Sequence, residues 1–252
     1  MDSLIVLTAQ IQGSSAWLWV NGVVVGLVEP GATWVQSIHQ YLVRGANDIR
    51  LQRVDAANFL PKTEVWVHLN IQLMGKDKNQ MLHRWNTSHP GLKWIKGGCL
   101  LQVDVDLPVS FPRWKFLDIQ QMKAEPSDAV CIQYFLPELL GALLKRDFAM
   151  LHAMFSIRNK ELCAAYGLDT IDFADSFKKR VMELSQSMES ASFYINPEDC
   201  VCIPTGIPTG SSPLYYLSDK ASRPFLNWVD PAGEWSIPLH LAVIQRQVYV
   251  VR

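Results

Sequence analysis

The sequence predicts an α+β protein of two domains, with an N-terminal antiparallel β-sandwich and C-terminal helices followed by an antiparallel sheet. Two observations carry this prediction. Short runs in the first half alternate apolar and polar residues with a period of two and are separated by turn residues, as in a sandwich. Near Glu125-Pro126 the apolar spacing becomes helical, and strands return later. We therefore expect domains over 1–122 and 126–252.

The first domain opens with a hairpin. Asn21-Gly22 lies between apolar runs, and a type I′ turn favours this dipeptide because both central residues need a positive φ. The alternation is clearest over 63–73, where Val65, Val67 and Leu69 are spaced by polar or aromatic residues. The strands expected in this domain are 3–11, 16–20, 23–27, 48–54, 63–73 and 99–107.

A polar segment, 75–91, separates two of these strands and is expected to be a long loop or a short helix. Long ordered loops on a sandwich often carry function. We expect His83, Arg84 and Trp85 in this segment to contact a partner, because an aromatic beside basic residues is a typical binding anchor.

The second domain is predicted to contain three helices, over 138–146, 148–166 and 170–189. Pro137 is acceptable in the first turn of the first helix, Asp147 is a favourable N-cap for the second, and Gly167 is expected to close it. The strands expected after the helices are 192–195, 214–217, 224–229, 235–244 and 247–251, with a hairpin turn over 244–247.

Residues 202–213 form the least regular segment, in which Ile-Pro-Thr-Gly occurs twice. This composition predicts a rigid, exposed loop. Thr209 and Ser211 in this loop are the remaining residues that we expect to contact a partner.

Composition excludes several classes of protein. The chain has 252 residues, 49% of them hydrophobic, which is too apolar for a disordered protein. Its formal net charge of −1 does not favour nucleic acid or an anionic membrane as a partner. No segment approaches the roughly 18 apolar residues of a membrane-spanning helix, and no basic signal region begins the chain. The five scattered cysteines are typical of a reducing compartment, so a cytoplasmic protein is expected.

Four groups of residues could carry chemistry, and an ordinary structural role is favoured for each. The histidines of 75–91 match no zinc-binding spacing, and the Cys-x-Cys pair has no second pair of cysteines near it. Two carboxylates on one strand are explained by the need to make a sheet face soluble. The glycine-rich segment lacks the lysine of a P-loop. The residues in question are His83 and His89 with Asp77, Cys200 and Cys202, Asp104 and Asp106, and the segment 206–212. We therefore expect no catalytic residue, metal or cofactor.

The region 15–54 resembles the galactose-binding-like jelly roll, a fold that hosts carbohydrate binders, domains of glycosidases and structural modules. The residues that carry this resemblance are Trp19-Val20-Asn21-Gly22, Val25-Gly26, Tyr41-Leu42 and Gly45-Ala46-Asn47-Asp48-Ile49-Arg50-Leu51.

The second half resembles the cone-shaped α+β fold of the nuclear-transport-factor-2 superfamily, through 143–151 and the terminal strand 247–251. The Asp-His acid/base pair of its enzymatic members has no matching position here. In type, the chain is similar to immunity proteins of bacterial type VI secretion toxin pairs: it has two modules, near-neutral charge, many tryptophans and no active-site signature.

These observations favour a non-enzymatic immunity protein that neutralises a cognate toxin by occluding its active site with a loop. The alternative is a carbohydrate-binding accessory module. Nine tryptophans are present, most of them expected to pack in sheets, and Trp34, Trp66 and Trp85 would form the stacking platform for a sugar. The sequence leaves the oligomeric state and the chemistry of the toxin open.

Overall fold

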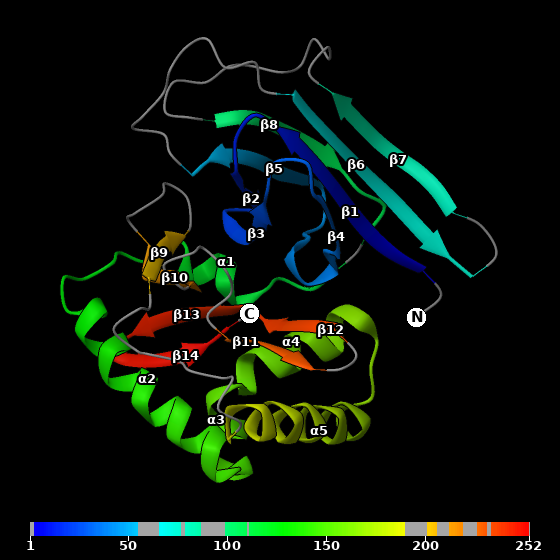
Figure 1. Cartoon of the computed structure of the whole chain (residues 1–252). Coiled ribbons are helices and arrows are strands. Elements are labelled where there is room, and N and C mark those ends of the chain that lie inside the picture. Colours follow the sequence, from blue (N-terminus) through cyan, green and yellow to red (C-terminus); the bar gives the residue numbers. More distant parts are fainter. Residues whose placement is uncertain are drawn as a thin grey trace. The chain divides into compact units, whose positions relative to one another are not determined.

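The computed structural model describes residues 3–54, 66–76, 79–86, 99–109, 111–189, 201–205, 212–218, 226–230 and 233–251. The chain divides into two compact units, Met1–Pro112 and Arg113–Arg252, so the boundary lies N-terminal to the expected 1–122 and 126–252. Antiparallel sheets come first, helices follow, and a small antiparallel sheet comes last (Figure 1). The predicted α+β fold class is confirmed.

The N-terminal unit contains two four-stranded antiparallel sheets, with the strand orders β4-β1-β6-β7 and β3-β2-β5-β8 (Figure 1). The first sheet is built from β1 (Ser3–Gln12), β4 (Thr33–Ser37), β6 (Trp66–Gly75) and β7 (Asn79–Asn86). The second sheet is built from β2 (Ala16–Val20), β3 (Val23–Val28), β5 (Ala46–Arg53) and β8 (Cys99–Asp106). The 3-10 helix η1 (His39–Tyr41) lies between β4 and β5 in the chain.

The strand β7 corrects the sequence prediction, which placed a loop or a short helix over 75–91. Residues 79–86 pair with β6 instead. Ile71 is opposite His83 but Gln72 is opposite Met81, so Leu82 is the extra residue of a β-bulge. Because of the bulge, the alternation of inward-facing and outward-facing side chains is interrupted within β7. A sequence pattern with a period of two therefore could not be recognised there.

Two asparagines join the turns of the β3-β2-β5-β8 sheet. Asn21 (φ 49°) and Gly22 (φ 76°) form the predicted hairpin turn. The Asn21 side chain donates to the Tyr41 carbonyl and to Asn47 Oδ1, both at 2.8 Å, and accepts a bond from the Asp48 amide at 3.0 Å. Three of the four segments that carry the jelly-roll resemblance, 19–22, 41–42 and 45–51, are therefore joined by hydrogen bonds.

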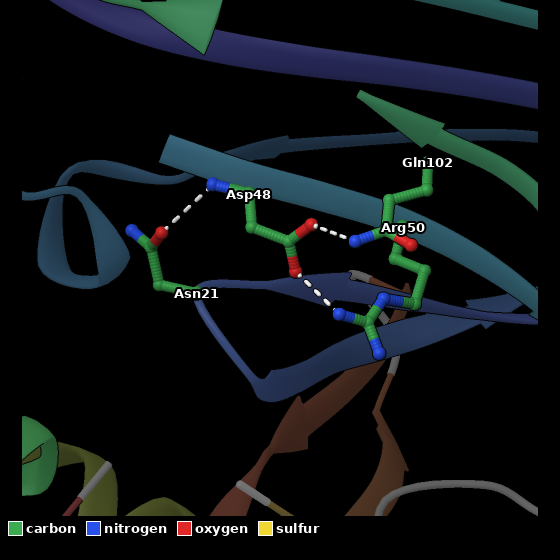
Figure 2. A network of polar contacts seen from close by, with 4 residues as sticks. All are labelled: Asn21, Asp48, Arg50 and Gln102. Atoms are coloured by element: carbon green, nitrogen blue, oxygen red, sulfur yellow. Dashed lines mark hydrogen bonds and ion pairs between the residues drawn. The ribbon is translucent and has the colours of Figure 1, made fainter. Parts of the chain in front are cut away.

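Asp48 extends this network along one face of β5 and β8. Its carboxylate accepts hydrogen bonds from Arg50 Nη2 at 2.9 Å and from Gln102 Nε2 at 2.8 Å (Figure 2). Arg50 and Gln102 are directly opposite each other in the β5–β8 register. Ile49 and Leu51, which are buried, point to the other face of the sheet. The face that carries Asp48 is thus charged and hydrogen-bonded.

The C-terminal unit has five α-helices among its described residues and a four-stranded antiparallel sheet of order β14-β13-β10-β9, with a separate β11–β12 pair (Figure 1). The helices are α1 (Lys115–Ile119), α2 (Asp128–Lys145), α3 (Phe148–Met154), α4 (Ser156–Tyr166) and α5 (Thr170–Glu189). The strands are β9 (Val201–Thr205), β10 (Leu214–Ser218), β11 (Leu226–Asp230), β12 (Gly233–Ile237), β13 (Leu239–Ile244) and β14 (Gln247–Val250).

Local signals placed several ends of these elements correctly. Asp147 caps α3 by accepting a bond from the Met150 amide at 3.0 Å, and Gly167 (φ 59°) closes α4. The predicted turn between β13 and β14 has positive φ at Gln245 and Arg246. The expected helix over 148–166 is divided at Phe155, whose buried ring lies 5.2 Å from that of Phe177. The expected strand 192–195 lies outside the described residues.

The first long helix starts earlier than predicted. The α2 helix begins at Asp128, whose buried carboxylate accepts bonds from the Tyr215 hydroxyl at 2.8 Å and the Glu125 amide at 3.2 Å. Pro137 is therefore inside the helix, not in its first turn. One face of α2 packs with α5 and the sheet in a common core, which includes Leu139, Leu143 and Leu241.

Replacing the exposed Pro137 by alanine is expected to raise the free energy of unfolding by about 1 kcal/mol, because proline lacks the N–H that would bond the Gln133 carbonyl and its ring crowds that carbonyl. Urea denaturation of the full chain measures the effect. The exposed neighbour Gln133 provides the control, since Gln133→Ala is expected to change stability by less than about 0.5 kcal/mol. A lower stability for Pro137→Ala would contradict the prediction.

Candidate functional site

One face of the β4-β1-β6-β7 sheet is turned away from the core of its unit. In β1, the residues Ile5, Leu7, Ala9 and Ile11 are fully buried, so the side chains between them occupy the opposite face. The register extends this outer face across all four strands. The outer face comprises Leu4, Val6, Thr8, Gln10 and Gln12 of β1, Thr33, Val35 and Ser37 of β4, Trp66, His68, Asn70, Gln72 and Met74 of β6, and Asn79, Met81, Arg84 and Asn86 of β7.

Polar side chains, all uncharged except Arg84, cross the middle of the outer face in two rows. Gln10 is opposite both Thr33 and His68, and its Nε2 donates to Thr33 Oγ1 at 2.6 Å. In the next row Asn70 is opposite Arg84, and Arg84 Nε donates to Asn70 Oδ1 at 3.2 Å. These cross-strand bonds hold amide and guanidinium groups in fixed positions at the surface.

Apolar side chains are exposed around these rows. Val35 is 59% exposed, Trp66 41%, and Leu4 and Met81 37% each. The indole of Trp66 is stacked on the ring of His68, with the ring centroids 5.7 Å apart and the planes within 16°. The outer face therefore combines a supported aromatic with three exposed aliphatic side chains.

Charge is sparse on the outer face. Arg84 is its one formally charged side chain, and none of its positions that the structure describes holds Lys, Asp or Glu. The β5–β8 face, by contrast, carries Asp48 and Arg50 (Figure 2), and Asp104 is opposite Asp48 in the register. Protein-binding surfaces are enriched in Trp, Met and Arg and depleted of Lys, Glu and Asp, and the outer face has this composition.

The structure separates the three residues expected to contact a partner in 75–91. Arg84 is exposed on the outer face, whereas His83 and Trp85 point to the inner face, opposite Ile71 and Leu69. Trp85 is only 8% exposed and is stacked on His83 with the centroids 5.3 Å apart. Trp85 is thus a core side chain, because β7 is a strand and alternate residues face inward. Thr209 and Ser211 lie outside the described residues.

The three tryptophans proposed as a sugar platform do not share a face. Trp34 is opposite Ala9 and Trp85 is opposite Leu69, so both face inward, while Trp66 is on the outer face. Sequence reasoning named Trp66 but missed Val35 and Met81 on the same face, which lie on β4 and β7, two strands that it did not predict.

Two concave sites of the C-terminal unit are lined by residues that the structure describes. One, of about 500 Å³, lies along α4 and α5 and is lined by residues that include Asn159, Cys163 and Phe173. The other, of about 470 Å³, lies between α2, α3 and the β13–β14 turn, beside the 74%-exposed Tyr134. Across the described part of the chain, no three His, Cys, Asp or Glu side chains are grouped so that they could hold a metal ion.

Comparisons with protein-family models, with curated proteins and with solved structures found no match to this chain. In the ranges that the structure describes, no helix has both the length and the apolar character needed to cross a membrane.

Proposed function

We propose that this protein is a non-enzymatic binding protein that uses the outer face to bind a protein partner. One observation carries the proposal: Val35, Trp66, Leu4 and Met81 are all exposed on one sheet face, and among the described positions of that face only Arg84 is charged. A sheet face that only meets water has no need of this composition, and exposed Trp, Met and Arg with few Lys, Asp or Glu residues are typical of interaction surfaces.

The size of the outer face suits a protein partner. Four strands spaced about 4.8 Å apart, with about 3.3 Å per residue along them, give a plane of roughly 500 Å² before side-chain relief is counted. A typical specific interface buries about 800 Å² on each partner. The outer face and its borders are therefore large enough for most of such an interface.

The partner class that we propose is a bacterial toxin, with this chain as its immunity protein in the cytoplasm. The flat outer face would cover the rim of the toxin's active site and block the entry of substrate. Trp66, held against His68 at one end of the face, would act as the aromatic anchor, and Arg84 would supply a directed hydrogen-bond donor. This mechanism replaces the occluding loop with a sheet face, because 79–86 forms the strand β7.

The Trp66→Ala variant is expected to bind the product of the neighbouring toxin gene at least about tenfold more weakly, since anchor tryptophans contribute most of the binding energy of an interface. Calorimetric titration of the full chain measures the affinity, and survival on co-expression with the toxin measures protection.

Tyr134→Ala is the matched control, because Tyr134 is a more exposed aromatic on α2 in the other unit. We expect Tyr134→Ala to bind as the unmodified chain does. Failure of the unmodified chain to bind the toxin or to protect the cell would refute the proposed immunity function. Equal losses of affinity in Trp66→Ala and Tyr134→Ala would show that the outer face is not the binding site.

A neutral carbohydrate is the second candidate ligand, favoured by one specific observation. The Trp66–His68 stack is next to the amides of Gln10 and Asn86 in the same row, and sugars bind by stacking on an aromatic and bonding to amides. A glycan array distinguishes the two candidates: binding that Trp66→Ala abolishes would support the sugar, and a blank array with tight toxin binding would support the protein.

A further inference from the structure

The concave site along α4 and α5, which we call the α4–α5 cavity, has an apolar wall. Ile171 and Phe173 of α5 line it, and its volume of about 500 Å³ is within the usual range for small-molecule sites. Ile171 is 71% exposed, which is unusual for an isoleucine and leaves its side chain available at the mouth of the cavity. The cavity can therefore cover the apolar body of a ligand.

A buried amide presents a hydrogen-bond donor in the α4–α5 cavity. Asn159 is only 7% exposed and its Oδ1 accepts a bond from Arg158 Nη1 at 3.2 Å. Arginine can only donate, so this bond identifies the oxygen of the amide and leaves the NH₂ group as the free end. Arg158 is itself held over the Phe155 ring, at 5.8 Å from the centroid. The NH₂ group is therefore the end of the Asn159 amide that can donate to an acceptor on a ligand.

Cys163 lies one helical turn after Asn159 and lines the same cavity. Burial raises the pKa of its thiol, and the negative charge of Asp169 raises it further. The side chain is therefore a neutral thiol at neutral pH. It adds a weakly polar surface to the cavity and no negative charge.

Of the charged side chains of lysine and aspartate that line the cavity, two are positive and one is negative. Lys160 makes no ion pair with any residue that the structure describes, whereas the charges of Lys178 and Asp175 offset each other at 3.7 Å. Asp175 is the only carboxylate in the described lining. Lys160, next to Asn159 in the chain, thus leaves the lining with a net positive charge beside the free amide donor.

We propose that the α4–α5 cavity binds a small monocarboxylate with an apolar body. The carboxylate accepts hydrogen bonds from the Asn159 NH₂ and the Lys160 ammonium, and the apolar body lies against Ile171 and Phe173. Such binding is independent of the outer face in the N-terminal unit, so the two proposals succeed or fail separately.

Cys163 serves as a reporter for this proposal. The full chain is treated with N-ethylmaleimide in the presence of sodium octanoate or of octanamide, which has the same length and no charge, and modified peptides are quantified by mass spectrometry. At an octanoate concentration about ten times its Kd, alkylation of Cys163 is expected to slow about tenfold, because only the unoccupied cavity reacts. Cys131, which is half-buried in the other concave site, is the internal control and should react at an unchanged rate.

Two variants connect the protection with the named groups. Lys160→Met keeps the length of an exposed side chain and removes its charge, and it should reduce the protection by octanoate to the level given by octanamide. Lys179→Met, on the exposed side of α5 and outside the cavity lining, should leave the protection intact. The proposal is overturned if octanoate does not protect Cys163, if octanamide protects it equally well, or if Cys131 is protected to the same extent.

Discussion

Replacing Asn47 by alanine is expected to lower the free energy of unfolding of the full chain by about 4 kcal/mol, because several buried groups lose their hydrogen-bond partners together. Asn47 is fully buried. Its Oδ1 accepts bonds from the Val43 amide and Asn21 Nδ2, both at 2.8 Å, and its Nδ2 donates to the Gly45 carbonyl at 2.8 Å and the Val43 carbonyl at 3.1 Å.

Urea denaturation followed by tryptophan fluorescence measures this loss, since Trp17 and Trp19 lie on β2 in the same sheet. Asn47→Asp tests the role of the donors: it keeps the size and the acceptor but places carboxylate oxygens against two carbonyls, and we expect it to be at least as destabilising as alanine. Asn79, an exposed asparagine of β7, provides the control, with a change of less than about 0.5 kcal/mol expected for Asn79→Ala. A loss below about 1 kcal/mol in Asn47→Ala would show that the turn tolerates the missing bonds.

The position of Asn47 explains why the start of this fold could be predicted from sequence. A turn depends on residues that are adjacent in sequence, so Asn21-Gly22 and 45–48 could each be predicted as turns from local sequence. The structure adds the hydrogen bond that joins the two turns. The cap at Asp147 and the stop at Gly167 are local in the same way. The start of α2 is different, because Asp128 is held by Tyr215, a residue distant in sequence that no local pattern reveals.

The candidate site could not be predicted, because a sheet face depends on register. A displacement of one residue along a strand moves every later side chain to the opposite face. The bulge at Leu82 has this effect in β7: it places Trp85 in the core and leaves Arg84 on the outer face. The sequence shows that Trp66, Trp85 and Arg84 are present, but only the pairing of β6 with β7 shows which of them share a surface.

The Gly26→Ala variant is expected to lose about 2 kcal/mol of stability through a clash between the two sheets. An added Cβ would lie 2.9 Å from Cε2 and 3.2 Å from Cζ2 of the Trp34 indole, closer than packed carbon atoms approach. Gly26 is on β3 and Trp34 is on β4, so the contact sets how closely these strands approach. Because the φ angle of Gly26 is not in the positive range, the backbone accepts alanine and the cost is steric.

A double-mutant cycle separates this clash from a general effect of the substitution. In a Trp34→Ala background the indole is absent, and Gly26→Ala should then cost less than about 0.5 kcal/mol. Gly45→Ala is the opposite control: no atom lies near its Cβ position but φ is +86°, so its cost of about 1 kcal/mol should persist in that background. If Gly26→Ala loses as much stability in the Trp34→Ala background as in the unmodified chain, the proposed contact is refuted.

The same clash should weaken partner binding, because Val35 follows Trp34 directly on β4 and any displacement of the indole moves Val35 on the outer face.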